Sequence, residues 1–143
     1  MEFEQIAGDI VRCMPEAVIF ADLQGIIRGW NAGAEAVFGF SATEAVGQSL
    51  DLIIPEKLRK AHWDGYDKAI ARGDTMPGRG SRITRALHKS GEQLYVDMSF
   101  AMVKSQSQEL LGSMAVARDA TARFLEEKKL RQQAAAMAAK PSE

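Results

Sequence analysis

The chain has 143 residues, 46% hydrophobic and 26% charged, so it is long enough to form one domain with a buried core. Its formal net charge of −1 gives no electrostatic argument for nucleic-acid binding. Its one cysteine, Cys13, excludes an internal disulfide framework and a cysteine-based metal cluster, and no apolar run approaches the length of a membrane span. The N-terminus lacks the basic and apolar regions of a signal peptide, so we expect a cytoplasmic protein.

The first thirty residues predict a helix followed by a β-hairpin. Residues 2–14 carry apolar side chains near helical spacing, and Pro15 ends this helix. The apolar run 17–21 predicts a strand, residues 22–25 form a turn, and residues 26–30 form the returning strand.

Two short helices follow the hairpin. Asn31 caps a helix that runs through Phe38, and Gly39 stops it. Ser41 and Glu44 have the spacing of a capping box, which predicts another helical turn.

The central helix is predicted from Pro55, which suits a first helical position, to about Ala71, with Gly73 as its stop. Leu58, His62 and Tyr66 share one face of this helix, which places a lone imidazole within an apolar and aromatic stripe. Spacing alone favours a core or boundary histidine with a satisfied hydrogen bond. The alternative is an iron ligand, because neutral imidazole binds iron well when its other nitrogen has a hydrogen-bond partner.

The rest of the chain predicts three strands and a final helix. After a glycine-rich segment, residues 81–87, 93–103 and 110–117 alternate between apolar and polar side chains. Two strands, short helices and then three strands indicate an α+β fold, in which helices cover one face of an antiparallel sheet. Residues 121–139 have too few apolar side chains to be buried against their own domain. We interpret them as an amphipathic helix that pairs with a partner, for example as a short coiled coil; the alternative is a frayed tail.

Three motifs in this order resemble the PAS sensory-domain family, over residues 15–121. The segment from Asn31 to Gly47 matches the family run N-x-x-A-E-x-x-F-G-Y-S-x-x-E-x-x-G. Lys89-Ser90-Gly91 looks like the K-D-G turn with Ser90 in place of Asp, and residues 118–121 are similar to the R-D-I-T at the start of the signalling helix.

The resemblance implies a PAS fold with a five-stranded antiparallel sheet, helices on one face and a flanking helix at each end. It divides the chain into an N-terminal flanking helix (1–14), a PAS domain (15–121) and a C-terminal signalling or coiled-coil helix with a tail (122–143). PAS domains hold haem, flavin, small organic ligands or nothing, so the fold alone does not name the ligand.

One PAS subset is similar in more detail. Residues 55–66 look like the P-E-x-x-R-x-x-H-x-G-Y of the haem oxygen sensors of the FixL type, with one extra residue after His62. This resemblance implies haem b with His62 as the proximal iron ligand. Arg82, nine residues before Gly91, matches the distal arginine of these sensors and is implied to stabilise bound oxygen. Gly80 stands where a related sensor has a methionine as a sixth ligand.

Haem also needs an apolar cleft, with cationic side chains near its propionates. We expect Leu58 and Tyr66 to line the cleft from the helix, and Lys68, Arg72 and Arg79 to surround its mouth. The opposite wall is expected from alternate residues of the strand 93–103. These cofactor-binding residues are Leu94, Val96, Met98 and Phe100.

The predicted function is therefore an oxygen sensor, without enzyme activity, that signals through its C-terminal helix. Its expected partners are the gas, a second copy through the flanking helices, and a downstream kinase or regulator, with no nucleic acid and no membrane. The alternative is a haem-free PAS module for dimerisation or small-ligand sensing. A flavin photosensor is disfavoured, because it needs an N-C-R-F-L cysteine near the central helix and Cys13 lies in the first helix instead.

Overall fold

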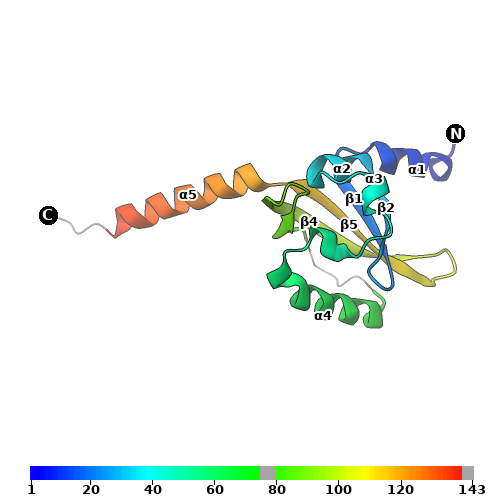
Figure 1. Cartoon of the computed structure of the whole chain (residues 1–143). Coiled ribbons are helices and arrows are strands. Elements are labelled where there is room, and N and C mark those ends of the chain that lie inside the picture. The colour runs from blue at the N-terminus through cyan, green and yellow to red at the C-terminus, as the bar shows by residue number, and fades with distance from the viewer. Residues whose placement is uncertain (75–79, 140–143) are drawn as a thin grey trace.

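The computed structural model describes residues 1–74 and 80–139 (Figure 1). Within them, five strands form one antiparallel sheet in the order β2-β1-β5-β4-β3. The strands are β1 (Ala17–Asp22), β2 (Ile27–Trp30), β3 (Arg82–Leu87), β4 (Gln93–Lys104) and β5 (Leu110–Asp119). The helices are α1 (Phe3–Cys13), α2 (Ala32–Phe38), α3 (Ala42–Ala45), α4 (Glu56–Arg72) and α5 (Thr121–Ala138), with a 3-10 turn η1 (Leu50–Ile53). The predicted α+β fold with a five-stranded antiparallel sheet is confirmed.

The core lies between the sheet and the short helices that follow β2. Phe38, Ile19, Ile27 and Val96 are the largest side chains that are fully buried. The short helix α2 packs against β1, and Phe38 at its end lies beside the ring of Trp30, with 5.6 Å between the ring centroids. Burial of these apolar side chains is the main force that holds the sheet and the helices together.

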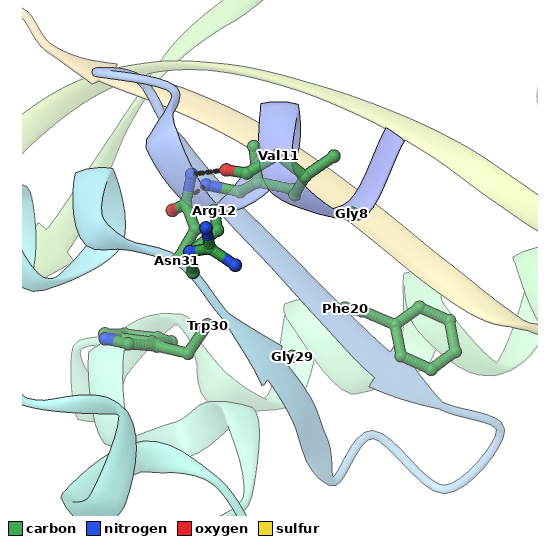
Figure 2. A pocket seen from close by; sticks show the side chains of 8 residues that line it. Gly8, Val11, Arg12, Phe20, Gly29, Trp30 and Asn31 are labelled. Carbon is green, nitrogen blue, oxygen red and sulfur yellow. Dashed lines mark hydrogen bonds between the residues drawn. The ribbon is translucent and has the colours of Figure 1, made fainter. Parts of the chain in front are cut away.

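Asn31 joins the N-terminal helix to this core. Its side-chain oxygen accepts from the backbone N–H groups of Val18 (2.8 Å) and Ala34 (2.9 Å), and the second of these bonds caps α2. Its side-chain nitrogen donates to the carbonyls of Val11 (2.8 Å; Figure 2) and Glu16 (3.0 Å). One buried side chain therefore fixes the end of α1, the start of β1 and the start of α2.

The long helix α4 begins one residue later than its proline. Pro55 was expected inside the helix, but it precedes α4 with an extended backbone, and Glu56 is the first helical residue. Gly73 ends the helix in the left-handed region with φ 79°, as predicted. The glycine-rich segment predicted after the helix lies mostly in residues 75–79, outside the described residues.

The helix α5 extends away from the sheet, on the side opposite to α1 in Figure 1. Only its first turn is attached: Phe124 stacks on Tyr95 of β4 with ring centroids 4.0 Å apart, and Arg123 lies 3.6 Å from Asp97. No residue of α5 is buried, as its sparse apolar stripe predicted. Among the described residues, no helix combines the length and the apolar character needed to cross a membrane.

Candidate functional site

A cavity of about 540 Å³ separates α4 from the inner face of the sheet. Its size lies within the range of about 300–1,000 Å³ that is typical of small-molecule sites. Its walls are mostly apolar, with a few polar groups. From α4 and the preceding turn it is lined by Leu50, Ile53, Ile54, Leu58, Ala61, His62, Gly65, Tyr66, Ala69 and Arg72. From the strands and Gly80 it is lined by Ile19, Ala21, Gly80, Arg82, Thr84, Arg85, Ala86, Met98, Phe100, Ala101, Met102, Ser113 and Ala115.

The face of α4 that lines the cavity carries small residues before and after His62 in the sequence. Ala61, Gly65 and Ala69 recur at helical spacing on the face that lines the cavity. A Cβ atom added to Gly65 would meet nothing within 4 Å. This face therefore leaves space for a flat ligand instead of filling the gap to the sheet.

His62 is held in this wall by contacts with two aromatic rings. Its Nδ1 is buried and has no hydrogen-bond partner among the described residues. Its ring centroid lies 4.7 Å from that of Trp63 and 5.8 Å from that of Tyr66. Burial lowers the pKa of the imidazole from its usual 6.5, and the more distant charges of Asp51 and Asp67 oppose this only in part. The ring is therefore neutral at pH 7, the form that binds metal ions.

The N-terminal half of α4 is anchored by polar contacts to the turn before it. The Trp63 Nε1 donates to the Asp51 carboxylate at 2.7 Å, and the Arg59 Nε donates to the Ile54 carbonyl at 3.0 Å. The Trp63 ring also lies on Gly25, where a Cβ atom would collide with it. These contacts hold the backbone that carries His62.

Tyr66 links α4 directly to the sheet. Its hydroxyl donates to the Asp22 carbonyl at the end of β1 (2.6 Å) and accepts from the Ser113 hydroxyl of β5 (3.2 Å). Burial is the main cause that raises the pKa of this phenol above 10, so the hydroxyl stays protonated and remains a donor.

Arginines supply the positive charge at the cavity. Arg82 and Arg85 of β3 and Arg72 at the end of α4 all contribute to its lining. Among the described residues, no carboxylate lies within ion-pair distance of Arg82, Arg85 or Arg72. Arg72 also donates from Nε to the Asp74 backbone carbonyl at 3.1 Å. Guanidinium groups beside an apolar cavity suit a ligand that is mostly apolar and carries anionic groups.

Six of the nine residues expected to bind the cofactor line the cavity: His62, Arg82, Leu58, Tyr66, Met98 and Phe100. Leu94 and Val96 are buried in the core on the same strand, but they do not line the cavity. Lys68 is exposed and is not part of the lining, whereas Arg72, one helical turn later, is. Arg79 lies outside the described residues.

Sequence reasoning missed Ser113 and Arg85. Ser113 is a small polar residue within an apolar strand, and only the position of Tyr66 shows its role. Arg85 contributes to the cavity lining from β3, although alternation along a strand places it on the opposite face from Arg82. Cys13 is exposed on α1 and takes no part in the cavity lining.

A second hollow of about 210 Å³ lies between α1 and the strands β1 and β2 (Figure 2). Val11, Val18 and Phe20 are among its lining residues. Its one charged lining residue, Arg12, forms an ion pair with Asp9 at 2.8 Å. No unpaired charge is therefore left there to select a ligand.

Comparison with known proteins agrees with this architecture. The family model described as the PAS fold matches residues 8–120. The sensor protein FixL of Bradyrhizobium diazoefficiens is 40% identical over 57 residues, which are 40% of this chain and 11% of FixL. The oxygen sensor protein DosP of Escherichia coli is 28% identical over 104 residues, 72% of this chain and 13% of DosP. The matched segments thus span only about a tenth of the length of these relatives.

Solved structures share the fold at low sequence identity. A PAS domain from Colwellia psychrerythraea superposes with a TM-score of 0.73 at 21% identity, covering 85% of this chain and 99% of that one. An RNA-binding light-oxygen-voltage receptor gives a TM-score of 0.75 at 18% identity, covering 92% and 37%. The LOV domain of the blue-light activated histidine kinase EL346 from Erythrobacter litoralis gives 0.60 at 16% identity, covering 74% and 96%. At these identities the likeness concerns the fold alone.

Proposed function

The chain belongs to the PAS family of signal-sensing domains, and from this premise we propose that its cavity binds haem b and senses oxygen. The observation that carries the proposal is the state of His62. It is a neutral and partly buried imidazole, its Nδ1 has no partner among the described residues, and it stands on the wall of a large apolar cavity. A histidine kept only for the core would normally satisfy its buried nitrogens with hydrogen bonds.

The residues of the cavity fit haem b. The macrocycle is flat and apolar, and the small residues Ala61, Gly65 and Ala69 leave a flat surface beside His62. Its carboxylates need cations, and the guanidinium groups of Arg72 and Arg82 contribute to the lining. The resemblance of residues 55–66 to the haem oxygen sensors of the FixL type supports the same ligand.

In this proposal each side chain has a separate task. When bound, haem b would supply an iron centre that takes up a diatomic gas. His62 would provide the protein ligand from α4, and Arg72 would pair with a propionate. Arg82 would donate hydrogen bonds from β3 toward the gas, which would favour oxygen over carbon monoxide because oxygen takes on more negative charge. The similarity to DosP, an oxygen sensor protein of Escherichia coli, supports this choice of gas.

We further propose that α5 carries the signal to a second copy or to a downstream kinase or regulator. The strand β4 contributes to both ends of this route: Met98 and Phe100 line the cavity, while Tyr95 stacks on Phe124 of α5. The backbone N–H of Ala120 donates to the Tyr95 carbonyl at 2.8 Å, so the start of α5 follows any displacement of β4. A ligand that shifts β4 would then bias the position of α5.

The test is an absorbance titration of the protein with hemin. The chain has two histidines, so His88→Ala is a matched control for His62→Ala. We expect a Soret band that shifts with dithionite and again with oxygen or carbon monoxide in the wild type and in His88→Ala, and the loss of bound haem in His62→Ala. Haem content unchanged in His62→Ala would exclude the proposed ligand. A wild type that takes up no hemin would leave a haem-free PAS module.

The role of Arg82 has its own test. A charge-assisted hydrogen bond contributes about 1.5–3 kcal/mol, so Arg82→Ala is expected to weaken oxygen binding about tenfold or more. Carbon monoxide binding should change less. Arg118→Ala is the control, because Arg118 pairs with Glu16 at 2.7 Å and does not line the cavity. Equal losses for both gases would contradict the role given to Arg82.

A further inference from the structure

The orientation of His62 needs an explanation, because no hydrogen bond fixes its Nδ1 among the described residues. Two rings touch the imidazole instead, Trp63 in a T-shaped arrangement at 78° and Tyr66 in a tilted one at 33°. When only ring contacts hold an imidazole, its orientation depends on how firmly those rings are themselves fixed.

The two rings have different attachments. Trp63 donates to the Asp51 carboxylate in the turn before α4, its ring lies on Gly25 in the turn between β1 and β2, and it does not line the cavity. Tyr66 lines the cavity and is fixed to the sheet on the other side of it. Of these two rings, Tyr66 is thus the one that lines the cavity and is hydrogen-bonded to strands of the sheet.

The anchor of Tyr66 is specific. Its hydroxyl forms two hydrogen bonds, one to the Asp22 carbonyl of β1 and one from Ser113 of β5, and these two strands pair with each other at Asp22 and Gly112. The Tyr66 and Ser113 side chains are 9% and 6% exposed, so water does not readily replace these bonds. The ring is therefore held at a fixed height above the sheet.

We propose that Tyr66 is the positioning residue of His62: by bonding to β1 and β5 across the cavity, it fixes the ring that orients the imidazole and sets the distance between α4 and the sheet. The part of this proposal that concerns the imidazole stands without any ligand. The part that concerns an iron ligand rests on the proposed function. Movements of β1 or β5 would then reach His62 through Tyr66.

The chain offers a matched control, because its two tyrosines are Tyr66 and Tyr95. Tyr95 stacks on Phe124, and its hydroxyl accepts from the Gln93 side chain at an exposed site. Tyr66→Phe and Tyr95→Phe therefore remove the same atom, the first at the cavity and the second at the base of α5. Ser113→Ala combined with Tyr66→Phe removes both partners of one bond, which avoids an orphaned buried hydroxyl if Tyr66→Phe alone is poorly folded.

The first measurement uses the protein without added hemin, labelled with ¹³C-histidine. Its proton–carbon spectrum contains the ring signals of His62 and His88, and His88→Gln assigns them. In the wild type we expect the His62 signals to be displaced by the neighbouring rings and to show NOE contacts with Tyr66. In Tyr66→Phe, or in the double variant, they should shift and broaden while the His88 signals stay in place, and Tyr95→Phe should move neither. Unchanged His62 signals in both Tyr66 variants would overturn the proposal.

The second measurement uses the protein loaded with haem and records the iron–histidine stretching band by resonance Raman spectroscopy. We expect this band to shift in Tyr66→Phe and to stay in place in Tyr95→Phe. A wild type that binds no haem, but whose His62 signals respond to Tyr66→Phe, would support the positioning role and overturn the proposed function. Haem bound through His62 with an unchanged band in Tyr66→Phe would overturn the positioning role alone.

Discussion

Replacing Asn31 by alanine tests how much one buried carboxamide contributes to the fold. The side chain is 5% exposed and satisfies backbone groups of three elements. In Asn31→Ala the N–H groups of Val18 and Ala34 lose their acceptor, and the carbonyls of Val11 and Glu16 lose a donor.

The expected loss follows from these bonds. Loss of an N-cap costs about 1 kcal/mol, and a further buried N–H without an acceptor costs about 1–3 kcal/mol. We therefore expect Asn31→Ala to lower the free energy of unfolding by about 3 kcal/mol. With a urea m-value of about 2 kcal/mol/M, the unfolding midpoint measured by circular dichroism would fall by about 1.5 M.

Two further variants separate the loss of the buried hydrogen bonds from a general effect of substitution. Ser41→Ala is the control, because Ser41 caps α3 through one exposed bond to the Glu44 N–H (3.2 Å), and it should cost only about 1 kcal/mol. Asn31→Asp keeps the accepted bonds, but turns an oxygen toward the carbonyls of Val11 and Glu16. It should be destabilised at pH 7 and recover in part when the carboxyl group is protonated. If Asn31→Ala lost no more stability than Ser41→Ala, the argument from buried hydrogen bonds would be refuted.

Three further predictions concern the core, the pH dependence and a close backbone contact. Phe38→Ala removes a fully buried ring and should lower the free energy of unfolding by about 4 kcal/mol in urea; a loss below about 2 kcal/mol would mean that the site collapses around the gap. The hydrogen bond from Lys89 is the largest cause that lowers the pKa of Glu44 from 4.5 to about 2, so this carboxylate stabilises the fold above pH 4.5, and its contribution is lost as the pH falls toward 2. Urea midpoints should therefore fall less between pH 5 and pH 3 in Glu44→Gln than in the wild type; parallel pH profiles would contradict this. Gly112→Ala should cost about 2 kcal/mol or more in the same assay, because Gly112 has φ +155° and an added Cβ would collide with the Ala21 carbonyl; a midpoint like that of the wild type would show that this contact relaxes freely.

Local signals in the sequence predicted most of the elements. Asn31 and Gly39 mark the two ends of α2, because a side-chain acceptor and a left-handed backbone are each needed at a particular place. The strand β4 was predicted from its alternation alone and is confirmed to within one residue at its end. Pro55 shows the limit of such signals, because the same residue suits the position before a helix and the first position within it.

The cavity was harder to predict than the elements around it. Alternation placed Leu94, Val96 and Met98 on the inner face, and all three are buried there. Alternation did not show at which residue of β4 the inner face stops packing against the core and begins to line the cavity. The hairpin before β4 bonds to α2, where the Lys89 N–H donates to the Phe38 carbonyl, so the first residues of β4 lie in the packed core. Only from Met98 onward does the strand line the cavity, and this boundary depends on tertiary packing.

The height of α4 above the sheet is the feature from which the proposed function follows. The small residues Ala61, Gly65 and Ala69 do not fill the gap, and Tyr66 spans it at one end. An apolar cavity costs about 24 cal/mol per Å³ if it stays dry, so about 540 Å³ would cost about 13 kcal/mol, as much as the whole stability of a typical domain. Such a space has to hold water or a ligand, and Phe100, 53% exposed, shows that it opens to solvent. A ligand that replaces this water with apolar contacts will therefore stabilise the folded chain by an amount that rises with the logarithm of its concentration divided by its Kd, so occupancy of the cavity and the free energy of unfolding are linked.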